Sequence, residues 1–286
     1  MNKHNIIISA DSTCDLSPEI IEKYGIVIDS MPVLLGDHSG YDGVDIFQEE
    51  VFEYTKKTGQ LAKTSALNTT LFEDRFSERT KDGATNIPFD ISSSLSGTYN
   101  NARLAALEIE NVHVIDSINL STGIGLQVIK AAEMARDGAT AEEIVTYIEA
   151  MKHRVDASFV IDTLTHLHKG GRCSAVAMFG ANALKLKPCI QVKNGSMGVV
   201  RKYRGKQSNV VLEYAKDQLS DLESIEPDRI FVTHTCPDTA MVDAVRDYVE
   251  SLGYFKEILV TKAGSTVATH CGPDTLGVLF VRKNNI

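Results

Sequence analysis

Residues 86–105 read NIPFDISSSLSGTYNNARLA, and the order of residue types in this stretch indicates the fold. The apolar run at residues 87–91 predicts a short strand, and the residues that follow Gly97 predict a helix. A second short strand is expected at residues 112–115. A strand, a helix and a strand in this order favour a parallel sheet that is covered by helices.

The same alternation extends through the first half of the chain. A buried strand is expected at residues 5–10, and Ser17-Pro18 begins a helix with a capping serine and a proline in the first turn. Further helices are expected at residues 46–58, 70–79, 125–136 and 141–153, the second of which opens with the capping box Thr70-x-x-Glu73. Gly123-Ile124-Gly125 is interpreted as a tight turn. We therefore predict an N-terminal three-layer α/β domain with a parallel sheet, residues 1–155.

A strong turn signal gives the second half a different pattern. Asn194-Gly195 separates strands expected at residues 188–193 and 198–203, which pair as a hairpin. The other expected elements are strands at residues 158–164, 229–234, 256–262 and 275–281, and helices at residues 176–185, 208–222 and 238–252. A hairpin among helices indicates a mixed sheet. The sequence thus predicts a C-terminal mixed α/β domain, residues 156–286.

The composition excludes several classes of function. The 286 residues carry a net charge of −9, which opposes nucleic acid binding because phosphates require a basic surface. There is no run of about 18 apolar residues that predicts a membrane span, and the five-residue apolar run before Asp11 is too short for a signal peptide. Five separated cysteines are typical of reduced thiols, so we expect a cytoplasmic protein. His166-x-His168 has no third ligand nearby, so no metal site is expected.

Polar residues come directly after the expected strands of the first half. These segments are Asp11-Ser12-Thr13, Ser92–Ser96 and Asp116-Ser117. The carboxyl ends of parallel strands meet at one edge of a sheet, where ligands bind, and Thr64-Ser65 is placed to join this edge from a loop. For Asp11 and Asp116, helix capping and turn closure remain an equal alternative.

The hydroxyls of residues 92–98 exceed the number that one helix cap requires. A hydroxyl-rich loop before a helix suits a carboxylate or a phosphate, because backbone N–H groups and the helix dipole stabilise negative charge. A nucleophilic serine fits less well, since the stretch does not read G-x-S-x-G. Neither this loop nor residues 168–172 have the spacing of a P-loop, so ATP binding is weakly supported.

The residues alone are also compatible with two other functions. One is a serine-dependent acyl hydrolase that uses the Ser92–Ser96 cluster with His270, which lies where a strand-like segment meets the Gly272-Pro273 turn. The other is a protein that binds phosphate or a phosphosugar at the same edge. Turnover of an activated ester without a partner distinguishes the hydrolase from either binding protein.

The segment 169–206 reverses the charge of the chain locally. It contains nine Lys and Arg residues and no Asp or Glu. Such a run is most often a solvated face. However, Gly170-Gly171-Arg172 and Arg204-Gly205-Lys206 place cations beside turns, which suits a phosphate group or an acidic partner. We favour partner docking.

Together, these stretches resemble the DegV family of bacterial fatty-acid-binding proteins. The similarity runs from residue 6 to the C-terminus, in the order of the family's motifs. The matching segments are Asp11-Ser12-Thr13-x-Asp15-Leu16, Lys63-Thr64-Ser65, Ile91-Ser92-Ser93-x-Leu95-Ser96-Gly97-Thr98-Tyr99-x-x-Ala102, Val114-Ile115-Asp116-Ser117, residues 164–172, Asn194-Gly195, Arg201-Lys202-x-Arg204-Gly205 and Thr269-His270-x-Gly272-Pro273. Each motif is weak alone, whereas the combination is specific.

The resemblance implies two α/β domains with a long-chain fatty acid in a buried tunnel. It implies that hydroxyls of two loops hold the carboxylate, here Thr64, Ser65, Ser93 and Ser96, with His270 nearby. It implies no catalytic residue in this chain and no cofactor apart from the bound fatty acid.

The resemblance also implies a partner for this chain. The partner is a separate ATP-dependent fatty acid kinase, similar to dihydroxyacetone kinases, which converts the presented carboxylate into an acyl phosphate for phospholipid synthesis. Arg172 and Arg204 are then candidates for kinase docking or phosphoryl handling. Transient contact with a membrane is compatible with such a carrier.

The chain departs from the family pattern at two places. Ala66-Leu67-Asn68 replaces Gln-Pro-Ser, which bears on the shape of the loop and on the preferred acyl chain. Asp274 replaces a glycine, and it is expected to add negative charge near the carboxylate. We expect both changes to be tolerated.

Overall fold

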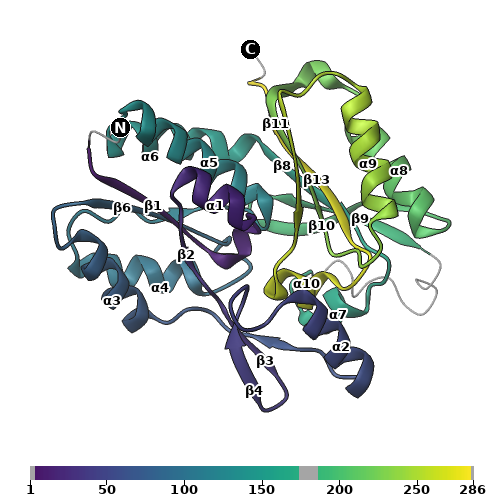
Figure 1. The fold of residues 1–286 in the computed structure, drawn as a ribbon, viewed down its shortest axis with the longest axis horizontal. Helices are drawn as coiled ribbons and strands as arrows, with labels where there is room; N and C mark the ends of the chain where they lie inside the picture. The colour runs from purple at the N-terminus through teal and green to yellow at the C-terminus, as the bar shows by residue number, and fades with distance from the viewer. Residues whose placement is uncertain (1–3, 174–185, 285–286) are drawn as a thin grey trace.

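The first half of the chain forms a four-stranded parallel sheet, as predicted (Figure 1). The computed structural model describes residues 4–173 and 186–284. The strand order is β2-β1-β6-β7, and every neighbouring pair is parallel. The elements of this half are β1 (Ile6–Asp11), α1 (Pro18–Tyr24), β2 (Val27–Asp29), α2 (Gln48–Thr58), α3 (Thr69–Thr80), β6 (Thr85–Asp90), α4 (Thr98–Ala105), β7 (Ile115–Asp116), α5 (Thr122–Asp137) and α6 (Ala141–Met151).

Helices cover both faces of this sheet. Figure 1 shows α5 and α6 above the strands and α3 and α4 below them, which gives the expected three layers. A small antiparallel sheet lies to one side, with β5 (Lys63–Thr64) and β4 (His38–Tyr41) on either side of β3 (Pro32–Leu35). Thr64 is therefore held on an edge strand rather than on a loop.

The second half forms a six-stranded mixed sheet, also as predicted. Its order is β10-β9-β8-β13-β11-β12, and only the β11–β12 pair is parallel among the described strands. Its elements are β8 (Val155–Val160), α7 (Thr165–Gly170), β9 (Lys187–Lys193), β10 (Ser196–Tyr203), α8 (Gln207–Gln218), β11 (Ile225–His234), α9 (Ala240–Ser251), β12 (Glu257–Lys262), α10 (Ser265–Cys271) and β13 (Leu276–Arg282). The helix predicted at residues 176–185 lies outside the described residues.

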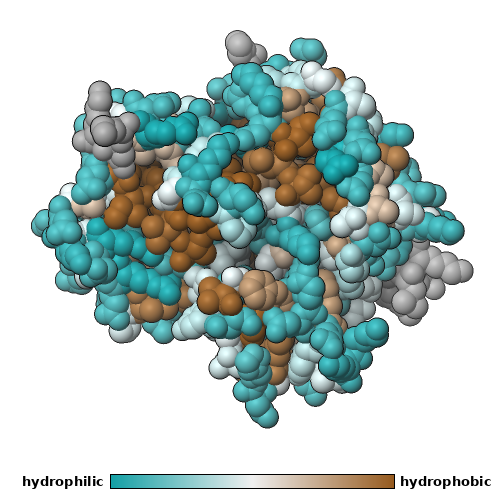
Figure 2. All heavy atoms as spheres, viewed as in Figure 1, coloured by the Kyte–Doolittle hydropathy of each residue, from teal (hydrophilic) through white to brown (hydrophobic). Residues whose placement is uncertain are grey.

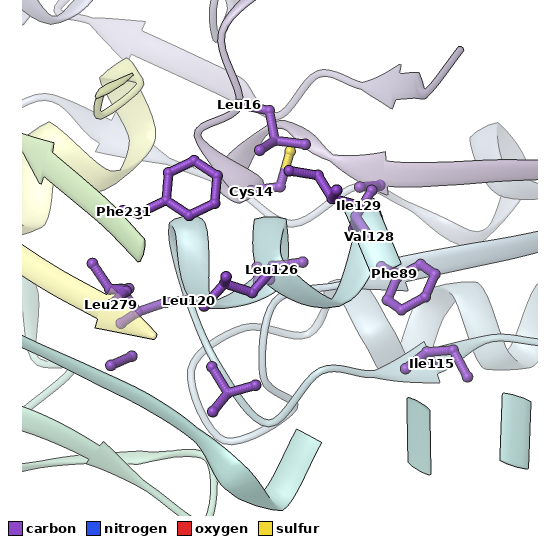
Figure 3. Close-up of a cluster of buried hydrophobic side chains, with 14 of the residues drawn as sticks. Cys14, Leu16, Phe89, Ile115, Leu120, Leu126, Val128, Ile129, Phe231 and Leu279 are labelled. Atoms are coloured by element: carbon purple, nitrogen blue, oxygen red, sulfur yellow. The ribbon is translucent and has the colours of Figure 1, made fainter. Parts of the chain in front are cut away.

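Helix α5 packs between the two main sheets. It contacts β1 and β6 on one side and β8, β11 and β13 on the other, and most of its side chains are buried. Figure 3 shows Leu126 of α5 between Phe89 and Ile115 on one side and Phe231 and Leu279 on the other. The two sheets thus share one hydrophobic core. The domain boundary at residue 155 stays a prediction, although the strands of the two main sheets fall on either side of it.

The prediction of a tight turn at Gly123-Ile124-Gly125 was wrong, because these residues lie inside α5. The glycines allow close packing instead. A Cβ atom at Gly125 would lie 2.7 Å from Leu16 Cδ2 and 3.1 Å from the Cys14 carbonyl oxygen. At Gly123 it would lie 2.2 Å from Asn119 Oδ1. Helix α5 therefore needs glycine where it meets the segment after β1 and the segment after β7.

Two other local predictions were wrong. The cap of α3 is Asn68, whose Oδ1 accepts from the Leu71 N–H, and not Thr70. The segment with His270 is the helix α10 rather than a strand, and His166 and His168 lie on α7. Short polar and β-branched residues are compatible with a helix or a strand, so tertiary packing decides which of the two forms.

The surface combines polar side chains with local apolar patches. Figure 2 shows a mostly hydrophilic face with hydrophobic residues gathered over part of the N-terminal sheet and beside α9. Within residues 4–173 and 186–284, no helix has both the length and the apolar character needed to cross a membrane.

Candidate ligand-binding site

The polar strand ends of the first half meet at one edge, as expected for parallel strands. Asp11 ends β1, and its carboxylate accepts from the Ile91 N–H at 2.7 Å and from Thr13. Asp116 ends β7 and accepts from the Ser93 hydroxyl at 2.6 Å. These bonds tie three strand ends together, so both aspartates have the structural role that the sequence left open.

The hydroxyls of residues 92–96 have separate partners. Ser92 is buried, and its hydroxyl donates to the Gly195 carbonyl at 2.8 Å. The Ser93 hydroxyl donates to Asp116, and the Ser94 N–H donates to Ser92 Oγ at 3.2 Å. Ser96 Oγ lies 2.9 Å from Thr98 Oγ1. Most of this hydroxyl-rich loop is therefore occupied by contacts within the protein.

A cavity lies between the two halves of the chain, next to this loop. Thr64, Ser65, Ser96, His270 and Arg172 of the predicted set line it, together with Met31, Ala66, Ile91, Leu95, Leu120, Met197, Thr266, Val267 and Cys271. Ser93 is not among the lining residues. The structure thus brings together four of the five predicted carboxylate ligands, whereas the side chain of Ser93 pairs with Asp116.

His270 is half-buried in this cavity, as Thr64 and Ser96 are. Its Nε2 lies 3.0 Å from Thr64 Oγ1. Burial, with a smaller contribution from the positive charge of Arg172, lowers the pKa of His270 to about 4. The imidazole is therefore neutral at pH 7.

The surroundings of Nδ1, the second ring nitrogen of His270, determine which atom donates in the hydrogen bond between His270 Nε2 and Thr64 Oγ1. Nδ1 is buried without a hydrogen-bond partner among the described residues, and a Cβ at Gly170 would lie 2.5 Å from it. An unpaired N–H is costlier to bury than an unpaired lone pair, so we assign the proton to Nε2. Nε2–H then donates to Thr64 Oγ1, which leaves the Thr64 O–H free to donate to a ligand.

Helix α10 places His270 through contacts with the first half of the chain. Asp15 Oδ1 accepts from the Gly264 N–H at 2.7 Å. Asp42 Oδ1 accepts from the Ser265 N–H at 2.7 Å and from its hydroxyl at 2.8 Å. Both carboxylates are buried and satisfy N–H groups at the start of α10. No local sequence pattern marks Asp42 for this role.

A second, mostly apolar cavity lies next to the first. The two share Leu120, Val267 and Cys271, and the second is also lined by Phe159 and Leu279. Several of its wall residues carry hydroxyls, but these bond to protein atoms: Ser121 to Asp15 at 2.5 Å, Thr233 to Thr122 at 2.6 Å, Thr235 to the Gly272 carbonyl at 2.6 Å and Thr275 to the Cys271 carbonyl at 3.1 Å. With the hydroxyls occupied in this way, the wall suits an apolar ligand.

Arg172 and Arg204 lie at different positions on the protein. Arg172 lines the first cavity, and its guanidinium donates to the Gly170 carbonyl at 2.7 Å. Arg204 follows the end of β10 and is exposed. Lys185 of the basic segment lies outside the described residues.

The two departures from the family pattern have different positions. Ala66 lines the first cavity. Asp274 lines neither cavity, and the charged groups around it are Asp162, Lys187 and Asp238. Its φ of +57° lies in the left-handed region that favours glycine. The structure therefore does not support added charge next to the ligand.

No group of three or more potential metal ligands occurs in the part of the chain that the structure describes. His166 Nδ1 lies 3.1 Å from the Thr269 carbonyl oxygen, and this contact packs α7 against α10.

Fold and site define a class of protein: an α/β protein with two main sheets and a pocket whose wall is polar near Thr64 and His270 and apolar elsewhere. The chain belongs to the DegV family, whose model, described as an uncharacterised protein family, matches residues 5–283.

Relatives with sequence and structural similarity support this assignment. A DegV domain-containing protein of Clostridium perfringens is 32% identical, over 99% of this chain and 100% of its own length. A fatty acid-binding protein of Thermotoga maritima is 31% identical, over 94% and 95%. The solved structure of a fatty-acid-binding DegV family protein from Thermus thermophilus is 27% identical, covers 98% of this chain and 100% of that chain, and has a TM-score of 0.90.

Proposed function

We propose that this chain binds one long-chain fatty acid and presents its carboxylate to a separate ATP-dependent kinase. One observation carries the proposal. A mouth lined by Thr64, Ser96 and a neutral His270 shares three wall residues with a neighbouring apolar cavity. The fatty-acid-binding relatives from Thermotoga maritima and Thermus thermophilus support the choice of ligand.

The carboxylate is assigned to the polar mouth. A buried ionised group must be hydrogen-bonded, because its desolvation is costly. The Thr64 O–H is free to donate, Ser96 has a hydroxyl in the same wall, and Ser65 lies exposed at the mouth. Ser93 was predicted as a further ligand, but its bond to Asp116 does not support this role.

The acyl chain is assigned to the second cavity. Burial stabilises the bound chain by about 0.8 kcal/mol per methylene. The two cavities measure about 60 and 30 Å³, which is room for only a few water molecules. A chain of about 16 carbons therefore requires wall side chains to move. Met31 and Met197 are suited to this movement, because methionine is unbranched and flexible.

The kinase step rests on exposed cations. Arg172 lies at the mouth of the cavity, and we assign it to contact with a phosphoryl group. Arg204 lies exposed elsewhere, and we assign it to contact with an acidic surface of the partner. The partner that the family resemblance implies is a fatty acid kinase similar to dihydroxyacetone kinase, and its product is an acyl phosphate.

A serine-dependent hydrolase receives less support from the geometry. A catalytic serine requires a histidine base that a third group orients. Among the described residues, His270 bonds to Thr64 rather than to a serine, and its Nδ1 has no partner.

Titration of the lipid-free protein with hexadecanoic acid and with hexadecan-1-ol tests the binding proposal. The two ligands share an acyl chain and differ in the headgroup. We expect the acid to bind about tenfold or more tightly than the alcohol, because only the acid forms charge-assisted hydrogen bonds. Equal affinities, or no binding of either ligand, contradict the proposal. Hydrolysis of a p-nitrophenyl ester by the protein alone favours the hydrolase instead.

The variant Arg204→Ala tests the kinase step separately. With the purified partner kinase, ATP and bound fatty acid, we expect slower phosphorylation at unchanged fatty-acid affinity. Lys57→Ala is a control, since Lys57 is an exposed cation paired with Glu53 on α2. Equal phosphorylation rates for wild type and Arg204→Ala remove Arg204 from this role.

A further inference from the structure

A basic groove lies at one end of the six-stranded sheet, apart from the lipid cavities. Strand β8 begins at Val155, whereas β9 ends at Lys193 and β13 ends at Arg282. Because β8 is antiparallel to both neighbours, these ends meet. The hollow there measures about 420 Å³, several times the volume of either lipid cavity.

The groove gathers positive charge in a chain whose net charge is −9. Its basic lining residues are Lys152, His153, Arg154, Lys193, Arg282 and Lys283, and Asp156 is its only acidic lining residue among those described. These cations come from the end of β9, from the end of β13 and the residue after it, and from the 3-10 helix at Lys152–Arg154 that precedes β8.

Only part of this charge is neutralised by ion pairs. Arg282 Nη2 lies 2.7 Å from Asp156, Lys152 Nζ lies 2.7 Å from Glu149, and Arg154 pairs with Glu226. Lys193 and Lys283 are exposed, and no carboxylate within the described residues lies within 4.0 Å of either ammonium group; Lys283 lies 6.0 Å from the centre of the Tyr254 ring. Two lysines thus face solvent at the rim of a hollow with a cationic wall.

The groove shares no lining residue with the lipid cavities, although they are neighbours. Asn119 lines the groove and the next residue, Leu120, lines both lipid cavities. Arg204 is at the other end of the β9–β10 hairpin, because Tyr203 pairs with Lys187 while Ser196 pairs with Lys193. An anion held by Lys193 is therefore at the opposite end of the hairpin from Arg204, and Arg172 does not line the groove.

We propose that this groove binds a small molecule that carries phosphate groups. Phosphates bring two or more charges and several acceptor oxygens, which match lysines and arginines spread around a hollow. The concave shape fits a small ligand, and the negative net charge disfavours nucleic acid or an anionic membrane as the occupant.

Calorimetric titration of the full chain with inorganic pyrophosphate at low ionic strength tests the proposal. We expect one site whose affinity falls as salt is added. In the double variant Lys193→Ala/Lys283→Ala, the affinity should fall about tenfold or more, because two charge-assisted contacts are lost. Both lysines are exposed, so the variant is expected to fold.

The double variant Lys57→Ala/Lys81→Ala is the matched control, since it removes two exposed lysines of α2 and of the end of α3. It should bind pyrophosphate like the wild type. Absence of binding to the wild type, or an equal loss in both double variants, overturns the proposal. Loss of binding in Arg172→Ala with normal binding in Lys193→Ala/Lys283→Ala places the anion in the lipid mouth and also overturns it.

Discussion

At the scale of single residues, the hydroxyls of the serine-rich loop have different surroundings. Ser92 joins the loop to the β9–β10 turn and Ser93 joins it to Asp116, whereas Ser96 lines the first cavity. Sequence alone counts these hydroxyls but does not show their partners, because the partners lie on other strands. The count therefore overstated the number available for a ligand.

The matched pair Ser96→Ala and Ser93→Ala tests this division. We expect Ser96→Ala to weaken fatty-acid binding by roughly 1–3 kcal/mol, the cost of one lost hydrogen bond to a buried charge. Ser93→Ala should change the affinity by less, since its hydroxyl serves Asp116. The measurement is the dissociation constant of hexadecanoic acid for each variant. A larger loss in Ser93→Ala restores Ser93 as the carboxylate ligand.

His270 makes folding stability depend on pH in a defined direction. Burial lowers its pKa to about 4 in the folded chain, whereas an unfolded histidine has a pKa of about 6.5. Below pH 6.5 the unfolded state therefore takes up a proton that the folded state does not. Stability from the neutral imidazole is present above pH 6.5 and is lost as the pH falls towards 4.

Urea unfolding at pH 7.5, 6.0 and 5.0 checks this expectation. The wild type should lose more stability across this range than His270→Gln, which has no titrating ring. The comparison with the variant removes the contributions of His166 and His234, whose pKa values burial also lowers. Parallel losses in the two proteins contradict a buried neutral His270.

At the scale of elements, α10 links the two halves of the chain. Asp15 and Asp42 come from segments far away in sequence, yet both accept hydrogen bonds at the start of this seven-residue helix. So short a helix is not stable alone, and its position follows from these tertiary contacts. For this reason the sequence around Thr269-His270 did not reveal a helix.

The variant Asp42→Ala tests the role of this contact. We expect unfolding free energy to fall by about 1–3 kcal/mol, because buried donors of Ser265 lose their acceptor. Fatty-acid affinity should also fall, since α10 carries His270. Asp37→Ala is the control, as Asp37 is exposed in the turn between β3 and β4. The role of Asp42 is refuted if both variants have wild-type stability.

Regular elements were easier to predict than their boundaries. The strand, helix and strand around residues 86–116 and the hairpin at Asn194-Gly195 follow from local apolar patterns and turn residues, and the structure confirms them. Gly123 and Gly125 misled the prediction because their function is close packing against Asn119 and Leu16, which no local pattern reports.

At the scale of the whole molecule, the candidate site lies where two sheets share a core. The polar residues of the mouth are marked in the sequence by short motifs, so Thr64, Ser65, Ser96 and His270 were predictable. The apolar wall was not, since Met31, Leu120, Met197 and Val267 come from four distant segments and resemble ordinary core residues. Under the proposed function, the preferred acyl chain length depends on this wall.

Native mass spectrometry of the chain, purified from the cells that produce it, tests the central claim most directly. We expect a population heavier than the polypeptide by the mass of one fatty acid, with 16 or 18 carbons as the expected length, and organic extraction should release that acid. Ser96→Ala should carry a smaller bound fraction. Wild-type protein that shows only the polypeptide mass under these conditions, and does not take up added hexadecanoic acid, contradicts the account.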